Sequence, residues 1–233
     1  MILNNKTVLV TGGTGSLGKV LVRRLLSSES GGTPKKIIVF SRDEGKQHDM
    51  RVNYLNNKYG TDEIIYKNFN NLLEFRIGDI RNYADIRSAI DEVDIVINAA
   101  ALKQVPTCEY FPKQAIDTNS NGVFNLVRAI QESNSHVETV IGISTDKAAK
   151  PINVMGMTKA LQERIMISGN ITIPRTKFNK CWPIKVIGEP DINPLSFKNA
   201  IIEPVKVIAP IEAPNDISIK LAILILPGDP KLN

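Results

Sequence analysis

Cysteine and histidine are scarce, with two residues of each among 233. Cys108 and Cys181 form no CxxC pair, so we expect no disulfide framework and a reducing, cytoplasmic compartment. His48 and His136 lie far apart in the sequence, without the spacing of metal ligands. We therefore expect no structural metal.

Long runs of one residue class are also absent. The net charge is +5, but the basic residues are scattered, so a solvated basic surface is favoured over a nucleic-acid partner. No apolar run reaches the length of a membrane span, and "MILNNKTVLV" lacks the pattern of a signal peptide. We therefore expect no membrane partner.

Short runs rich in Val and Ile alternate with amphipathic segments over the first 168 residues. The predicted strands are residues 7–10, 36–40, 73–77, 94–97 and 137–143. The predicted helices include "GSLGKVLVRRLL", "NYADIRSAI" and "KQAIDTNSNGVFNLVRAIQES". This alternation predicts an α/β fold, a Rossmann-like doubly wound parallel sheet with right-handed crossovers.

Two of these helices carry apolar stripes at helical spacing, which are predicted to face the core. The first stripe contains Leu17, Val20, Leu21 and Leu25. The second contains Ile116, Val123, Leu126, Val127 and Ile130.

The composition changes near residue 178. Nine of the 13 prolines lie between Pro174 and Pro230, and proline interrupts both helices and central strands. "PIKVI" and "SIKLAILIL" are candidate strands in a region otherwise predicted to be irregular. We therefore predict a dinucleotide-binding domain over residues 1–178 and a reduced or divergent C-terminal region over residues 179–233.

A glycine-rich turn, "VLVTGGTGSLGK", joins the first predicted strand to the first helix. Gly12 permits a tight turn, Gly15 lets a pyrophosphate approach the backbone, and Gly18 lets the helix pack closely against the sheet. The helix N-terminus offers N–H groups and a positive dipole end to a phosphate. The pattern therefore predicts a dinucleotide site.

The end of the second predicted strand indicates which dinucleotide is preferred. NAD sites usually place a carboxylate here, but this chain has Ser41 and Arg42. Since a guanidinium pairs with a 2′-phosphate, NADP is favoured over NAD, although Asp43 follows directly. In "GDIRN", Asp79 stands where a carboxylate can accept from an adenine amino group, and "NAAALKQVP" is small enough to pass over the cofactor.

With these motifs, residues 1–168 resemble the extended short-chain dehydrogenase/reductases. Within that superfamily the resemblance is to the polysaccharide-biosynthesis branch: inverting UDP-N-acetylglucosamine 4,6-dehydratases and related epimerases. The matching stretches are "TGGTGSLGK", "FSRDEGKQ", "GDIRN", "NAAALKQVPTCEYFP", "TNSNG", "STDKA" and "PINVMGMTKA".

The resemblance implies roles for individual residues. Thr145 resembles the hydroxyl residue that bonds to the sugar, and Asp146 and Lys147 resemble the acid and base. Lys159 resembles the lysine that holds the nicotinamide ribose. Met155 occupies the position of a tyrosine, a substitution known in this branch. The cofactor contacts predicted from motif and resemblance are Gly12, Thr14, Gly15, Ser16, Leu17, Gly18, Ser41, Arg42, Lys46, Asp79, Ile80, Ala99, Ala100, Ala101, Lys103, Asn119 and Lys159.

Met155 raises the question of which residues transfer protons, because a thioether has no titratable group. The family reaction implies oxidation at carbon 4 of the sugar, elimination across carbons 5 and 6, and hydride return to carbon 6. We hypothesise that Lys147 removes the carbon 5 proton and Asp146 protonates the leaving hydroxyl. Met155 would then be an apolar surface beside nicotinamide or sugar.

Three functions stay open from the sequence. The first is a UDP-N-acetylglucosamine 4,6-dehydratase, a lyase, and the second is an epimerase that uses the same ketone. The third is a catalytically silent NADP-binding remnant, because the family's C-terminal lobe is expected to need on the order of 100 residues. We expect a UDP-sugar substrate and a homo-oligomer, since a missing lobe would expose apolar surface.

Overall fold

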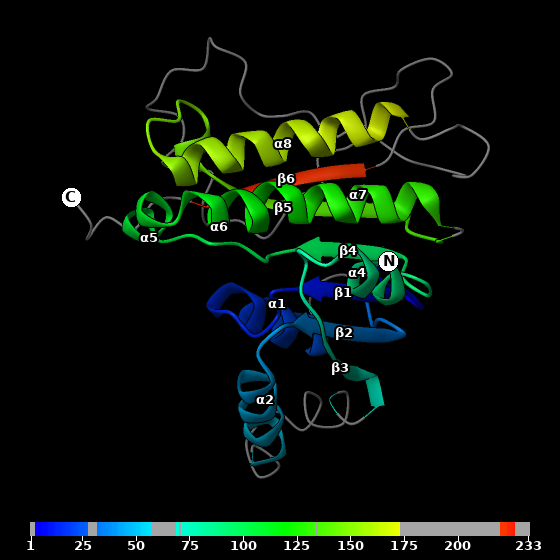
Figure 1. Cartoon of the computed structure of the whole chain (residues 1–233). Coiled ribbons are helices and arrows are strands. Elements are labelled where there is room, and N and C mark those ends of the chain that lie inside the picture. The colour runs from blue at the N-terminus through cyan, green and yellow to red at the C-terminus, as the bar shows by residue number, and fades with distance from the viewer. Residues whose placement is uncertain are drawn as a thin grey trace, which may run out of the picture.

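The computed structural model contains one parallel sheet covered by helices (Figure 1). It describes residues 3–27, 32–56, 69, 71–133, 135–172 and 220–226. The strands in these ranges are β1 (Thr7–Thr11), β2 (Lys36–Ser41), β3 (Leu73–Ile77), β4 (Ile95–Asn98), β5 (Thr139–Thr145) and β6 (Lys220–Leu226). Their order is β3-β2-β1-β4-β5-β6. The predicted doubly wound sheet is confirmed.

The helices lie between the strands in the sequence. They are α1 (Ser16–Leu26), α2 (Glu44–Asn56), α4 (Tyr83–Ala89), α5 (Val105–Tyr110), α6 (Pro112–Ile116), a π-helix η2 (Asp117–Asn121), α7 (Gly122–Glu132), a 3₁₀ turn η3 (Asp146–Ala148) and α8 (Val154–Thr172). The sequence analysis did not predict α2, because its mostly polar sequence lacks a clear apolar stripe.

Alternate residues of the strands enter two cores on opposite faces of the sheet, as strand geometry requires. On one face, Val8, Val10 and Val39 pack with Val22 of α1 and Met50 of α2. The other face is larger and includes residues of α4, α7 and α8. Its members include Leu9, Phe40, Val96, Ile86, Leu126 and Met166. Because both faces are covered, the central strands read as continuous apolar runs.

The predicted stripes are each wrong at one residue. In α1 the buried residues are Gly18, Val22, Leu25 and Leu26, whereas Val20 is 51% exposed. The close contact of Gly18 with the glycine turn sets this rotation. In the second stripe, Ile116 is exposed and Ala115 is buried. The π-helix adds a residue between α6 and α7, so a single helical period does not fit both.

The C-terminal strand β6 pairs in parallel with β5 and lies within "SIKLAILIL", which confirms that candidate strand. The candidate strand "PIKVI" and the predicted domain boundary near residue 178 lie outside the described residues. In the part of the chain that the structure describes, no helix is both long and apolar enough to cross a bilayer.

Candidate active site

The order of the strands fixes where a ligand can bind. The chain proceeds from β1 outward to β2 and β3, and then from β4 outward to β5 and β6. Sites in open α/β sheets form at the carboxyl ends of the strands, at the point where the order reverses. Here that point lies between β1 and β4, which are followed by the glycine turn and by "AAALKQ".

The glycine turn lies directly against the segment that follows β4. Gly12 has a φ of +65°, and a Cβ atom on it would lie 2.8 Å from the Cα and N atoms of Ala100. A Cβ atom on Gly18 would lie well under 3.0 Å from the carbonyl oxygen of Gly12. Any side chain at either position would therefore separate elements that now touch.

Helix α1 begins beside this turn. Gly15 is its N-cap and provides no side-chain hydrogen bond to the first turn, which also contains no acidic residue. The first N–H groups of α1 and the positive end of its dipole thus suit an anion. Together with the two crowded glycines, this geometry fits the pyrophosphate of a dinucleotide.

Asn119 of the π-helix fixes the segment that follows β4. Its Oδ1 accepts from the Leu102 backbone N–H at 2.8 Å, and its Nδ2 donates to the Leu102 carbonyl at 2.9 Å and to Thr158 Oγ1 at 3.0 Å. Asn119 is fully buried. One amide side chain thus connects the segment above the predicted cofactor to α8.

The predicted acid and base stand where β5 ends. Thr145 Oγ1 donates to Asp146 Oδ1 at 2.9 Å, and Lys147 Nζ lies 3.9 Å from the same oxygen. The side chains of Asp146 and Lys147 are 53% and 41% exposed. Gly156 of α8 is pressed against the Lys147 carbonyl, because a Cβ atom there would lie well under 3.0 Å from it. The structure therefore brings Thr145, Asp146 and Lys147 together beside α8.

Lys159 is buried behind this group, with 4% of its surface exposed. Its Nζ donates to the Ile143 carbonyl and to Gln162 Oε1, both at 2.8 Å. Burial lowers the pKa of Lys159 to about 8, opposed by the negative charge of Glu163. Gln162 also donates to the Ile143 carbonyl at 3.1 Å.

Met155 belongs to a small apolar cluster of its own. It is buried with Cys108 and Ala115, and Leu102 and Val105 pack against the same cluster. Its thioether joins α8 to α5, α6 and the segment after β4. Met155 therefore contributes packing at the position where the resemblance implies a tyrosine.

The adenine end of the predicted site lies beyond β2 and β3. Ser41 is buried and accepts from Gln47 Nε2 at 3.1 Å, whereas Arg42 is exposed. Asp43 accepts from the Lys46 backbone N–H at 3.0 Å and pairs with Lys46 Nζ at 2.9 Å. Since Lys46 hydrogen-bonds to it, the pKa of Asp43 lies below its usual value. Both of these contacts of Asp43 are thus made by Lys46, in the first turn of α2.

Comparison with known proteins agrees with this geometry. Residues 8–182 match the model of a family described as polysaccharide biosynthesis protein. The chain belongs to this family. It lies in the polysaccharide-biosynthesis branch of the extended short-chain dehydrogenase/reductases, which confirms the resemblance found in the sequence.

Individual relatives each match between 70% and 77% of the chain. A protein of Rickettsia felis named UDP-glucose 4-epimerase is 46% identical over 164 residues, which cover 70% of this chain and 43% of that protein. The structure of Pen from Bacillus thuringiensis has a TM-score of 0.64 and 32% identity, covering 77% of this chain and 49% of Pen. DesIV, a dTDP-glucose 4,6-dehydratase of Streptomyces venezuelae solved with NAD, has a TM-score of 0.56 and 21% identity, covering 70% of this chain and 51% of DesIV. The DesIV likeness concerns the fold alone, and this chain spans under half the length of the curated relatives it matches.

Two residues of this family member were not identified from the sequence. Gln162 follows Lys159 by three positions, a spacing that places both on one helix face and could have pointed to their contact. Arg81, in "GDIRN", makes several hydrogen bonds to Asp79, which no spacing rule predicts. Gln162 contacts Lys159 and Arg81 contacts Asp79, and both of these partners were predicted from the sequence to belong to the site.

Proposed function

We propose that this protein is a nucleotide-sugar-modifying enzyme, a UDP-N-acetylglucosamine 4,6-dehydratase that uses NADP. The observation that carries the proposal is the group formed by Thr145, Asp146 and Lys147 at the carboxyl end of β5, beside a buried Met155. Elimination needs both a base and an acid. Asp146 and Lys147 provide that pair, whereas Met155 provides neither.

The residues of the chain divide the proposed reaction between them. A bound nicotinamide dinucleotide would supply reversible hydride transfer at the sugar. Lys147 removes the carbon 5 proton, and the electrons of that C–H bond form the double bond to carbon 6. The bond between carbon 6 and its oxygen breaks as Asp146 donates a proton, so water leaves. The Thr145 hydroxyl, which donates to Asp146, would also orient the sugar.

The dinucleotide itself would be held by the glycine turn and α1. NADP is favoured by Arg42, which is exposed, and by the pairing of Asp43 with Lys46, which removes the competing carboxylate. Replacing Arg42 with alanine should weaken NADP far more than NAD in a titration. Equal losses for the two dinucleotides would contradict this assignment.

The proposed base can be tested directly. Lys147→Ala should abolish solvent-deuterium exchange at carbon 5 of UDP-N-acetylglucosamine, followed by NMR with NADP present. Lys150→Ala is the matched control, since Lys150 is an exposed lysine three residues further along. Exchange retained in Lys147→Ala would eliminate Lys147 as the base.

A second candidate function is epimerisation, favoured by the name of the Rickettsia relatives, UDP-glucose 4-epimerase. The NMR assay separates the candidates by product. A 4-keto-6-deoxy sugar supports the dehydratase, and a diastereomer of the substrate supports the epimerase. No turnover with NADP still bound supports a catalytically silent NADP-binding protein.

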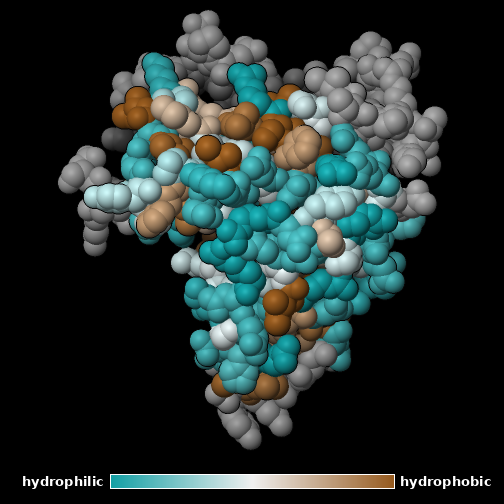
Figure 2. Space-filling view, viewed as in Figure 1, coloured by the Kyte–Doolittle hydropathy of each residue, from teal (hydrophilic) through white to brown (hydrophobic). Residues whose placement is uncertain are grey.

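We also propose that the protein forms a homo-oligomer. Apolar surface gathers over the α5–α8 part of the molecule (Figure 2). The exposed large apolar residues of α6, α7 and α8 are Ile116, Phe124, Met157 and Leu161. Light scattering that gives the mass of a single chain at micromolar concentration would contradict this proposal.

A further inference from the structure

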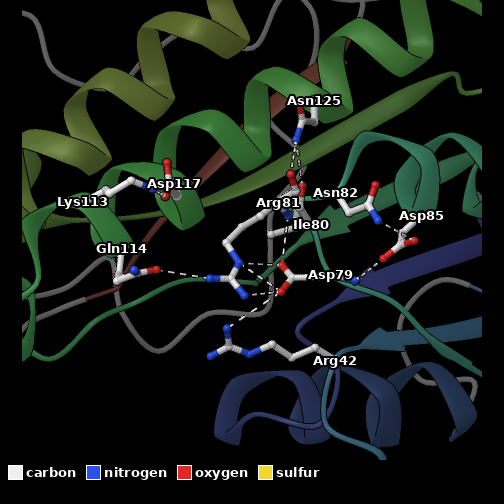
Figure 3. Close-up of polar contacts among 10 residues, drawn as sticks. All are labelled: Arg42, Asp79, Ile80, Arg81, Asn82, Asp85, Lys113, Gln114, Asp117 and Asn125. Atoms are coloured by element: carbon white, nitrogen blue, oxygen red, sulfur yellow. Dashed lines mark hydrogen bonds and ion pairs between the residues drawn. The ribbon is translucent and has the colours of Figure 1, made fainter.

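Asp79 lies between two guanidinium groups at the carboxyl ends of β2 and β3 (Figure 3). Arg42 follows β2, and Arg81 lies in the loop that joins β3 to α4. From its place after the third predicted strand, Asp79 was expected to bind the adenine amino group, and Arg81 had no expected role. The geometry of the three side chains indicates different roles for Asp79 and Arg81.

Arg81 holds Asp79 firmly. Its Nε donates to both carboxylate oxygens at 3.0 Å, its Nη2 donates to Oδ2 at 2.5 Å, and its backbone N–H donates to Oδ1 at 3.0 Å. A carboxylate offers about four acceptor positions, and three N–H groups of Arg81 already bond to them, with the Nε–H shared between both oxygens. The Arg81 guanidinium accordingly holds the pKa of Asp79 below its ordinary value. An adenine amino group would therefore compete with these donors for the Asp79 carboxylate.

Arg81 is itself held in place by α6 and α7. Its Nη1 donates to Gln114 Oε1 at 3.3 Å, and its carbonyl accepts from Asn125 Nδ2 at 2.9 Å (Figure 3). On the other side of the loop, the Asp79 backbone N–H donates to Asp85 at 2.9 Å. The loop is thus fixed before any ligand arrives.

Arg42 is held much less firmly. Its Nη1 lies 3.9 Å from Asp79 Oδ2, beyond hydrogen-bonding distance, and its side chain is 61% exposed. The Arg42 guanidinium can therefore move to another anion at little cost. Of the other carboxylates near this loop, Asp117 pairs with Lys113 at 2.6 Å, and Asp85 accepts from Asn82 and from the Asp79 backbone.

We propose that Arg81 determines the NADP preference of this protein by neutralising Asp79, so that Arg42 is left to bind the 2′-phosphate. This inference rests on the proposed NADP-dependent function. Without Arg81, the Asp79 carboxylate would attract Arg42 and repel the phosphate dianion. Arg81 is a positioning residue in this account, since its guanidinium is already occupied by Asp79 and Gln114.

The experiment measures the dissociation constants of NADP and NAD by isothermal titration calorimetry. Arg81→Gln should raise the constant for NADP roughly tenfold, the expected size for a lost charge-assisted contact, and leave that for NAD nearly unchanged. Arg87→Gln is the matched control, because Arg87 lies on the adjacent helix α4 and pairs with Asp91, which follows that helix. It should change neither constant.

A double variant separates neutralisation from direct contact with the phosphate. Asp79→Asn combined with Arg81→Gln should restore most of the NADP affinity, since no carboxylate is then left to compete for Arg42. If the double variant binds NADP as weakly as Arg81→Gln, Arg81 contacts the phosphate itself and the inference is wrong. Equal weakening of NADP and NAD would indicate a merely structural role, and overturns it too.

The outcomes also separate this inference from the proposed function. A wild-type protein that binds neither dinucleotide, or prefers NAD, overturns the NADP-dependent function and this inference together. A wild-type protein that prefers NADP, with an unchanged preference in Arg81→Gln, overturns this inference alone. Should Arg81→Gln fail to fold, Arg81→Lys retains the charge without the fork, and an intermediate preference is expected.

Discussion

Replacing Lys159 with methionine should change how the stability of this protein depends on pH. The Lys159 amine is almost fully buried, and its pKa falls from an ordinary value of 10.5 to about 8 because burial disfavours the cation. Below pH 8 the amine is protonated in both the folded and the unfolded chain, so the folded protein bears the full cost of burying the cation. Between pH 8 and 10.5 the folded protein releases the proton first, and stability rises with pH.

The magnitude follows from the difference in pKa. A fall of about 2.5 in pKa, at 1.36 kcal/mol for each unit, corresponds to roughly 3 kcal/mol in the free energy of unfolding. About 2.5 kcal/mol of this change should appear by pH 10. Methionine has a similar length and no proton to release, so the variant lacks this contribution.

The assay is urea denaturation of the wild type and of Lys159→Met at pH values from 7 to 10. The unfolding free energy of the wild type should rise relative to that of the variant across this range. Taking the difference between the two proteins cancels the titration of all other groups. Lys150→Met, an exposed lysine, should follow the wild type. Parallel curves for the wild type and Lys159→Met would refute the reasoning.

Two further substitutions test the support of the site. Gly156→Ala should destabilise the fold by about 1–3 kcal/mol, because its Cβ atom would push against the Lys147 carbonyl. Chemical denaturation measures this loss, with Arg164→Ala as a control at an exposed position of the same helix. Asn119→Ala should cost roughly 2–3 kcal/mol by leaving the Leu102 backbone groups without their buried partner, and increased amide hydrogen exchange at Leu102 would confirm the cause. Unchanged exchange there would contradict it.

The strands could be predicted because burial on both faces of a parallel sheet demands continuous apolar runs such as "TVLV" and "KIIVF". Helix faces were less predictable. Val20 fits the apolar spacing of α1, but the contact between Gly18 and the glycine turn rotates it into solvent. That contact is tertiary, so no period within the helix reveals it.

The candidate site was likewise predictable only in part. The glycine turn could be predicted because its backbone conformation restricts the residue type, as the φ of Gly12 shows. The partners of Lys159 and Asp79 could not all be predicted, since they include the Ile143 carbonyl, which any residue type would present. Spacing identifies side chains that share a helix face, but not backbone groups that segments distant in the sequence bring to them.

The π-helix between α6 and α7 gives this segment one residue more than a regular α-helix would need. Its additional residue brings Ala115 and Val123 to the same inward side, although eight positions of a continuous α-helix would leave them about 80° apart. Deleting a single residue between them would leave a spacing of seven, which a regular α-helix places only about 20° apart, so both side chains would still point inward. The deletion would instead remove the widened turn that holds Asn119, whose side chain bonds to the Leu102 backbone and to Thr158. Its damage would thus come from the segment after β4, which loses its attachment to α8, and not from a rotated helix face.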